Sequence, residues 1–274
     1  MLVNAVVRYV KKMVPEFNIP GAGTLRGALK LGAQRAYTPV TVERNALAML
    51  QYTGGTTGVA KGAMLTHRNL VANMLQSRAW MIPAGVGQDT EIVITALPLY
   101  HIFALTANCL VYMALGGVNV LITDPRDMDG FVKELSKIPF TFLPGVNTLF
   151  NGLLNTPGFA DLDFSTLKGA LGGGMAVQRA VAERWREVTG TPLIEAYGLT
   201  ETSPAACINP MDLDGFNGCI GLPIPSTDCS ILNDAGEHLP QGESGELAVR
   251  GPQVMKGYWQ RPEATAEVIT PEGW

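Results

Sequence analysis

Short apolar runs alternate with longer amphipathic stretches over residues 91–196. The runs have the length of buried strands, and the stretches carry their apolar residues at helical spacing. The pattern predicts strands over 91–97, 118–122, 140–143, 167–171 and 192–196, with helices over 102–115, 127–137, 146–154 and 177–189. In the last helix one stripe holds Val177, Val181, Trp185 and Val188. Such alternation predicts an α/β fold, in which helices cover both faces of a parallel sheet.

The region before residue 91 carries a weaker pattern. It predicts a basic amphipathic helix over 2–13, a weak helix over 25–34 and a buried strand over 46–52. A loop is expected from this strand to Lys61, and Thr66 has the side chain of a good helix N-cap. The helix that it starts, 67–79, should turn one face inward, formed by Leu70, Met74 and Leu75.

The pattern changes near Pro210, where Gly, Pro and short β-type runs replace the alternation. Strands are predicted over 228–233 and 246–250, and Asn233-Asp-Ala-Gly236 has the composition of a turn. We therefore expect a partial α/β core over 1–208, followed over 209–274 by a β-rich subdomain of the same large domain.

Two segments raise the question of a membrane. Residues 102–123 contain no charged side chain, which is long enough for a span. However, Gly116-Gly117 divides them into a helix-like part and a β-branched part, which favours a buried helix, a turn and a buried strand. The basic helix over 2–13 could lie on a membrane surface, but packing against the rest of the protein is the preferred interpretation.

Composition narrows the functional classes. Apolar residues make up 47 % of the chain and charged residues 16 %, as in a compact globular enzyme. The net charge of −4 lacks the basic balance that is typical of proteins that bind nucleic acid. The four cysteines (Cys109, Cys207, Cys219 and Cys229) lack zinc-type spacing. The simplest interpretation is that these thiols are free and that the protein lies in the reducing cytoplasm. Peripheral contact with the inner membrane is a further possibility for its location.

The densest chemistry follows the strand over 46–52. Its loop provides backbone and side-chain donors from Tyr52, Thr53, Gly54, Gly55, Thr56, Thr57 and Gly58, and then the cation of Lys61. Glycines allow backbone N–H groups to approach a ligand, so this nest of donors suits an oligophosphate. The loop is not a Walker A sequence, because Ala60 precedes the lysine. The alternative is a plain flexible turn.

A second polar group, Glu195 to Pro204, also follows a predicted strand. Tyr197 offers a flat face to a base, Gly198 permits close approach, Thr200 can donate to a phosphate, and Glu201 suits Mg²⁺. An ordinary turn at the strand end is the alternative. His101 and Gly172-Gly173-Gly174 follow strands as well, so we expect all these segments to converge on one crevice at the carboxyl ends of the strands.

These motifs carry a resemblance. Tyr52 to Gly62 resembles the phosphate-binding signature of the acyl-adenylate-forming superfamily, and Tyr197-Gly-Leu-Thr-Glu201 resembles its second signature. Gly245 to Gly251 with Gly257-Tyr-Trp259 resembles a third. Within the superfamily the chain is similar, over its whole length, to bacterial long-chain fatty acid–CoA ligases. Such enzymes join a fatty acid to AMP, release pyrophosphate, and pass the acyl group to CoA.

The resemblance implies a role for each matching residue. Thr53 to Lys61 would hold the β- and γ-phosphates of ATP, Thr53 and Glu201 would bind Mg²⁺, and Thr200 would contact the α-phosphate. Tyr197 would stack on adenine, in a base pocket formed by Gly173, Gly174, Glu195 and Ala196. His101 would lie near the reacting carboxylate. The acyl chain would need an apolar tunnel with Phe103, Gly145 and Val146 as wall candidates, although core packing explains them equally well.

Family members are about twice as long, so the resemblance implies the central piece of such an enzyme, without the mobile C-terminal domain and its catalytic lysine. A partial enzyme without full activity is therefore expected. The alternatives are a non-catalytic module that binds nucleotide or fatty acid, and an adenylating enzyme for another acid, aryl or medium-chain. Missing neighbours would expose apolar surface, which predicts self-association into homo-oligomers.

Overall fold

The computed structural model describes residues 2–16, 18–54 and 59–274, and it divides the chain into two compact units, Met1–Val42 and Glu43–Trp274. The first unit contains α1 (Leu2–Ala5), a π-helical turn (Val6–Val10) and α2 (Leu25–Gly32). Thr24 caps α2 by accepting a hydrogen bond from the N–H of Gly27. The expected weak helix is thus confirmed, whereas the expected helix over 2–13 ends at Val10.

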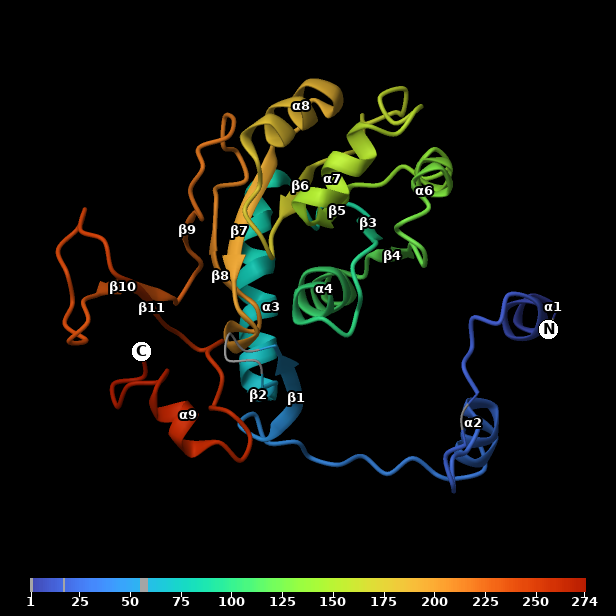
Figure 1. Ribbon diagram of the computed structural model, residues 1–274, viewed down its shortest axis with the longest axis horizontal. Helices are drawn as coiled ribbons and strands as arrows, with labels where there is room; N and C mark the ends of the chain where they lie inside the picture. Colours follow the sequence, from blue (N-terminus) through green and yellow to red (C-terminus); the bar gives the residue numbers. More distant parts are fainter. Residues whose placement is uncertain (1, 17, 55–58) are drawn as a thin grey trace. The chain divides into compact units, whose positions relative to one another are not determined.

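The second unit is built on a seven-stranded sheet with the order β4-β3-β5-β6-β7-β8-β9 (Figure 1). Its strands are β3 (Ile92–Thr95), β4 (Val118–Leu121), β5 (Phe142–Gly145), β6 (Gly169–Gly172), β7 (Leu193–Gly198), β8 (Ala205–Ile208) and β9 (Leu222–Pro223). β4, β3, β5, β6 and β7 run parallel, as predicted, and β8 and β9 extend the sheet in antiparallel fashion. The α/β fold is therefore confirmed, with an antiparallel edge that the pattern did not predict.

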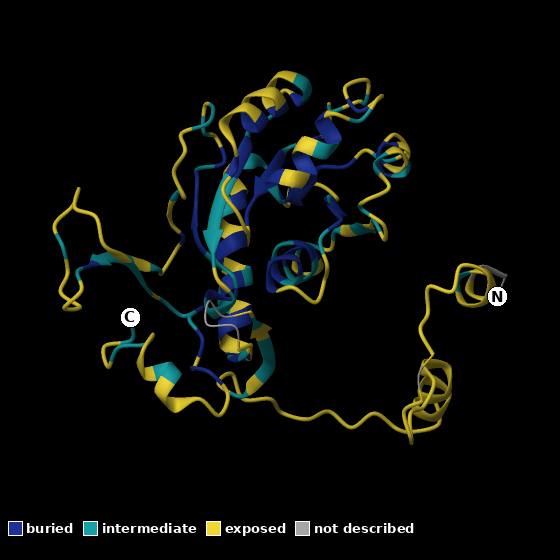
Figure 2. Cartoon of the chain, in the orientation of Figure 1, coloured by how far each residue is buried: buried dark blue, intermediate teal, exposed yellow. Residues whose placement is uncertain are grey.

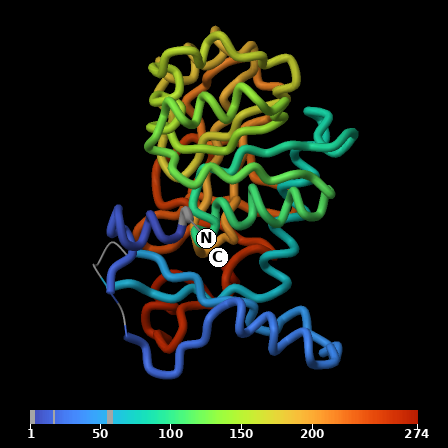
Figure 3. The backbone as a smooth tube through the Cα atoms, turned by 90° about the vertical axis from the view of Figure 1, so that its right-hand side faces the viewer, coloured from blue at the N-terminus to red at the C-terminus, as the bar shows by residue number. Residues whose placement is uncertain are grey.

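Helices cover both faces of this sheet. They are α3 (His67–Met81), α4 (Ile102–Ala104), α5 (Val111–Leu115), α6 (Met128–Leu135), α7 (Asn147–Leu154) and α8 (Arg179–Thr189). A π-helical segment, Leu105–Leu110, joins α4 to α5, so the expected helix over 102–115 is confirmed with a change of winding inside it. Figure 3 follows the chain through these helices, coloured from cyan through green to yellow.

Adjacent strand residues point to opposite faces, which is how both faces become apolar. Ile94, Leu143, Ala170 and Leu193 pack with Phe150 and Trp185 of the helices α7 and α8. Their neighbours Val93, Phe142, Leu171 and Ile194 pack with Met81 of α3 and Tyr112 of α5. Both α3 and α7 accordingly show a buried and an exposed side in Figure 2.

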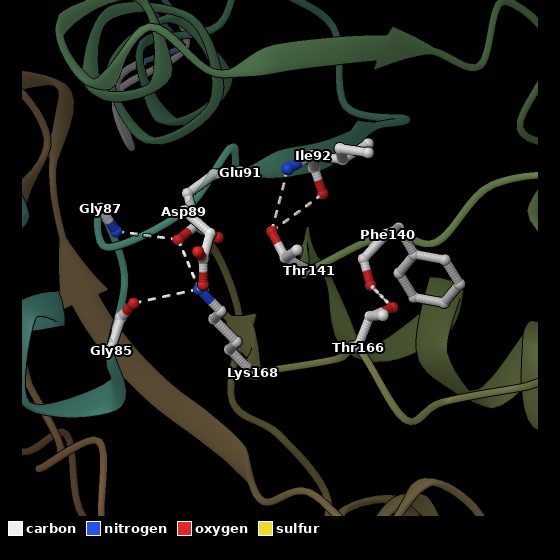
Figure 4. A network of polar contacts seen from close by, with 9 residues as sticks. All are labelled: Gly85, Gly87, Asp89, Glu91, Ile92, Phe140, Thr141, Thr166 and Lys168. Carbon is white, nitrogen blue, oxygen red and sulfur yellow. Dashed lines mark hydrogen bonds and ion pairs between the residues drawn. The ribbon is translucent and has the colours of Figure 1, made fainter.

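The amino end of the parallel sheet is closed by a polar network (Figure 4). The carboxylate of Glu91, just before β3, accepts hydrogen bonds from Lys168 Nζ at 2.7 Å and from the N–H of Gly87 at 2.8 Å. Lys168, just before β6, also donates to the carbonyl of Gly85. Burial alone would raise the pKa of Glu91, but hydrogen bonds led by that of Lys168 outweigh it and lower this pKa.

A two-stranded antiparallel sheet of β1 (Leu47–Thr53) and β2 (Lys61–Thr66) precedes α3. The expected burial of β1 is wrong, because the strand is only half-buried, and residues 61–66 form a strand that the pattern did not predict. The cap is confirmed, because Thr66 accepts a hydrogen bond from the N–H of Asn69 in a capping box. The expected inward position of Leu75 is also wrong, since its side chain is 50 % exposed.

The last part of the chain contains β10 (Asp228–Leu232) and β11 (Glu246–Arg250), which pair in a sheet of their own, and α9 (Pro262–Ala266). Both strands were predicted. Residues 102–123 form helix, turn and strand as expected, and no helix within the described ranges is long and apolar enough to cross a bilayer.

Candidate functional site

A cavity of about 250 Å³ opens at the carboxyl ends of β6 and β7. Parts of the segments that were expected to converge meet here. Residues predicted for the site that line the cavity are Thr53, His101, Phe103, Gly173, Gly174, Ala196, Tyr197, Gly198, Thr200 and Glu201. β1, the loop before α4, and the ends of β6 and β7 therefore supply one site, as the rule for open α/β sheets requires.

Other predicted residues lie outside this lining. Tyr52 is 61 % exposed on β1 and lays its ring against Gly62, and Lys61 pairs with Thr53 across β1 and β2. Gly145 and Val146 stand at the junction of β5 and α7. Gly55, Thr56, Thr57 and Gly58 lie outside the described residues.

Glu195 also lies outside the lining, in the middle of β7. Its carbonyl accepts a hydrogen bond from the N–H of Asn209. Burial raises the pKa of this carboxyl, and backbone hydrogen bonds from Val177 and Gly218 only partly oppose the shift. A base pocket that included Glu195 would therefore have a carboxyl group that is easier to protonate than usual.

The turn after β7 positions Thr200 and Glu201. A 3₁₀ turn, Thr200–Thr202, follows Leu199, whose N–H donates to the Thr202 hydroxyl at 2.9 Å. Gly198 makes this fold-back possible, because a Cβ there would collide with the carbonyl of Pro204. The side chains of Thr200 and Glu201 are thereby held at the cavity wall.

Glu201 is hydrogen-bonded to the segment after β11. Its carbonyl accepts from the N–H of Met255 at 2.8 Å, and its Oε1 accepts from the Tyr258 hydroxyl at 2.5 Å. Burial and this hydrogen bond raise the pKa of Tyr258, so the phenol stays protonated as a donor. Lys61 Nζ lies 5.2 Å from the centre of the Tyr258 ring, within cation–π range. Tyr258 thus links Lys61 to Glu201, a connection that no local sequence pattern revealed.

The buried side of α3 is polar, which sequence reasoning missed. Asn73 is fully buried and forms two hydrogen bonds with Ala205: it accepts from the N–H at 3.0 Å and donates to the carbonyl at 2.9 Å. Ser203 donates to the carbonyl of Gln253, and Gln253 contacts Gln76 of α3. These bonds fix the residues that directly follow Glu201. The helical spacing of Asn69, Asn73, Gln76 and Ser77 was the available signal.

His101 caps α4. Its Nδ1 accepts a hydrogen bond from the N–H of Phe103 at 3.2 Å, which requires a neutral ring to carry its proton on Nε2. The side chain therefore combines a structural role with a place in the cavity lining.

Much of the cavity lining is apolar. Among these residues, the pattern assigned Val111, Phe142 and Leu171 to a helix or strand only, and it assigned no element to Trp80, Met81 or Met211. Trp80 is anchored by a hydrogen bond from its indole N–H to the carbonyl of Asn209. Of the three wall candidates, Phe103 lines the cavity. The others could not be told from core residues, because a pocket wall and a core share the same residue types.

The cavity lining also contains hard oxygen donors. The hydroxyl of Thr53 and the carboxylate of Glu201 are the types of ligand that Mg²⁺ prefers, so the donor set fits the expected ion. In the part of the chain that the structure describes, no group of three or more His, Cys, Asp or Glu side chains could hold a metal by itself. A magnesium ion here would need oxygens from its ligand as well, as is common for Mg²⁺ with nucleotide phosphates.

Comparison with known proteins decides the family. The profile described as AMP-binding enzyme matches residues 7–259. This chain belongs to the AMP-binding enzyme family. It is 56 % identical over 273 residues to a long-chain-fatty-acid–CoA ligase of Salmonella typhimurium, covering 100 % of this chain and 48 % of the relative. It is also 36 % identical over 231 residues to a feruloyl-CoA synthase of Amycolatopsis, covering 82 % of this chain and 45 % of that protein.

Solved structures of the family share the fold. ATP-bound MatB from Rhodopseudomonas palustris superposes with a TM-score of 0.77 at 30 % identity, over 90 % of this chain and 48 % of MatB. A long-chain-fatty-acid–CoA ligase from Archaeoglobus fulgidus gives 0.76 at 27 % identity, over 92 % of this chain and 52 % of that structure. The chain spans about half the length of the curated relatives it matches.

Proposed function

We propose that this chain belongs to an ATP-dependent long-chain fatty acid–CoA ligase and contains most of its nucleotide and acyl pockets. The observation that carries the proposal is a single cavity with two chemistries. Its lining combines the hydroxyl and carboxylate groups of Thr53, Thr200 and Glu201 with apolar residues that include Trp80, Phe142 and Met211. A carboxylic acid with a long alkyl chain and a nucleotide phosphate match these two parts.

The residues would act mainly by positioning and by stabilising charge. The Thr200 hydroxyl would donate to the α-phosphate, and Lys61 with Thr53, Gly54 and the loop after it would hold the β- and γ-phosphates. Tyr197 would stack on adenine beside Gly173, Gly174, Ala196 and Glu195. His101 would keep its Nε2 proton directed at an oxygen of the reacting carboxylate. Held in this way, the carboxylate and the α-phosphorus react as neighbours rather than as partners in solution.

Thr53 and Glu201 would hold Mg²⁺, which would neutralise phosphate charge in the transition state. The hydrogen bond from Tyr258 to Glu201 supports this role, because it orients the carboxylate while leaving its second oxygen for the ion. CoA would receive the acyl group from the adenylate.

The substrate class has a second candidate. The feruloyl-CoA synthase relative shows that the family includes proteins named for an aryl acid. The higher identity to fatty-acid ligases favours the alkyl substrate for this chain. Measuring activity with palmitate, octanoate and ferulate would separate the two candidates. An enzyme with an aryl-specific pocket would show no activity on palmitate.

Fatty-acid-dependent exchange of labelled pyrophosphate into ATP tests the proposal, using this chain and a version extended at both ends to the length of the relatives. Exchange by either chain that disappears in Glu201→Ala supports adenylation at this cavity. Exchange by the extended chain alone would show that this piece is a binding module without turnover. No exchange from either folded protein would contradict the proposal.

We further propose that the protein is cytoplasmic and contacts the inner membrane peripherally through the basic segment 2–13, of which residues 2–10 are helical, and that it self-associates. The division at residue 209 into a core and a β-rich subdomain belongs to the same proposal. Light scattering with a single monomer peak would contradict self-association, and failure to sediment with anionic vesicles would contradict the membrane contact.

A further inference from the structure

Two thiols from different sheets face each other beside the cavity. The Sγ atoms of Cys207 on β8 and Cys229 on β10 lie 3.6 Å apart. Cys207 is buried in the seven-stranded sheet, whereas Cys229 is half-buried. A disulfide needs a sulfur–sulfur distance of about 2.05 Å, so an approach of roughly 1.5 Å would join them.

The hydrogen bond between the two thiols makes them chemically different. The hydrogen bond between the thiols lowers the pKa of Cys229, while the same bond and burial raise the pKa of Cys207. A thiol with a lowered pKa and partial exposure is the form that reacts with oxidants. The pair therefore combines a reactive outer sulfur with an inner sulfur in position to displace the product of its oxidation.

We propose that Cys207 and Cys229 form a reversible oxidation site that responds to peroxides and ties β10 to β8. The Cys229 thiolate attacks one peroxide oxygen, the O–O bond breaks, and a sulfenic acid forms on Cys229 with release of hydroxide or alkoxide. The Cys207 sulfur then attacks the sulfenic sulfur, the S–O bond breaks, and water leaves as the Cys207 proton is lost. For hydrogen peroxide, two thiols and one peroxide give one disulfide and two waters.

The bond would join parts of the fold that are otherwise separate sheets. β10 pairs only with β11 among the described strands, while β8 lies between β7 and β9. Cys207 is also the direct cross-strand partner of Tyr197, so its side chain lies on the same face as a residue of the cavity wall. Oxidation would therefore tether the β10–β11 sheet at the edge of the nucleotide-facing strand.

Peptide mapping after treatment of this chain with hydrogen peroxide tests the proposal without any assay of activity. Free thiols are alkylated before reduction, and newly released thiols are labelled afterwards. The expected result is an intramolecular Cys207–Cys229 link that dithiothreitol reverses. Hydrogen exchange of the amides in β10 and β11 should become about tenfold slower in the oxidised form, because the disulfide restricts the local unfolding that exposes these amides to solvent.

Matched variants separate this pair from the other thiols. Cys229→Ser should abolish the link and the change in hydrogen exchange, while Cys219→Ser, which removes an exposed thiol, should leave both intact. Circular dichroism checks that each variant is folded. Links through Cys109 or Cys219, or oxidation that stops at Cys219 while Cys207 and Cys229 remain thiols, would overturn the proposal. Failure of ligase activity would not bear on it.

Discussion

The two ends of the parallel sheet hold their charged side chains in different ways. At the amino end, Glu91 and Lys168 form an ion pair and also hydrogen-bond to backbone groups. The Glu91 side chain is fully buried. At the carboxyl end, Thr200 and Glu201 line an open cavity and are held by polar bonds from behind. Under the proposed function, charge at the amino end stabilises the fold, whereas charge at the carboxyl end is available for a ligand.

The largest expected effect is on stability, at the amino end. Lys168→Met should lower the free energy of unfolding by about 3 kcal/mol, because it leaves the buried Glu91 carboxylate without its cation. Urea denaturation measures this change. Nucleotide affinity of the folded protein should stay within about twofold, since the network is at the opposite end of the sheet from the cavity.

Lys137→Met is the matched control for that change. Lys137 also pairs with a glutamate at 2.7 Å, but both partners, Lys137 and Glu134, are about half exposed. An exposed pair contributes about 1 kcal/mol or less. Equal losses in the two variants would show that the Glu91–Lys168 network is not the special feature of the amino end.

The next effect concerns the ligand, at the carboxyl end. Glu201→Ala should weaken magnesium-dependent ATP binding about 100-fold, by removing a proposed metal ligand. Its cost in stability should be about 1 kcal/mol, the value of the lost hydrogen bond from Tyr258. Calorimetric titration of ATP with and without Mg²⁺ measures the first quantity. ATP affinity that ignores the substitution would show that the metal assignment is wrong.

Asn73→Ala tests whether the polar side of α3 supports nucleotide binding at the carboxyl end as well as the stability of the fold. Loss of both bonds to Ala205 should cost about 2 kcal/mol of stability, because the buried backbone groups lose their partner. It should also weaken ATP binding several-fold, by loosening the turn at Thr200 and Glu201. Asn73→Leu, similar in volume, should do the same. Stability loss with unchanged nucleotide affinity would confine α3 to a structural role.

The smallest effect is a dependence on pH. The pKa of Glu91 in the folded protein lies below its ordinary value of 4.5, so its contribution to stability is fully present above that value. As pH falls through the lower folded value, the carboxylate takes up a proton and the contribution is lost. Urea midpoints measured between neutral pH and acid should decline less steeply in Glu91→Gln. Identical slopes would mean that Glu91 is not a source of the acid sensitivity.

Sequence reasoning was most successful where a residue's surroundings are set locally. The period of apolar residues located β3 to β7 and the helices between them, and the side chain of Thr66 located the start of α3. It failed where a distant segment decides the outcome. Asn73 is buried because the backbone of Ala205 needs partners, and Leu75 is exposed because polar residues take the inner side of α3.

The candidate site shows the same division. The Gly- and Thr-rich segments after predicted strands indicated which residues meet at the carboxyl ends, because strand direction fixes that edge. Tyr258 belongs to the third signature, but nothing nearby in sequence indicates its bond to Glu201, which spans 57 positions. The apolar part of the cavity lining was not predictable, because Phe142 and Leu171 occupy ordinary strand positions.

The most direct test of this account is one calorimetric comparison of ATP·Mg²⁺ binding by the unaltered chain, Glu201→Ala and Lys168→Met. The account predicts binding that is weakened about 100-fold only in Glu201→Ala, with reduced stability but ordinary affinity in Lys168→Met. Equal affinity in all three proteins, or a loss in Lys168→Met alone, would contradict the assignment of ligand binding to the carboxyl end and of stability to the amino end.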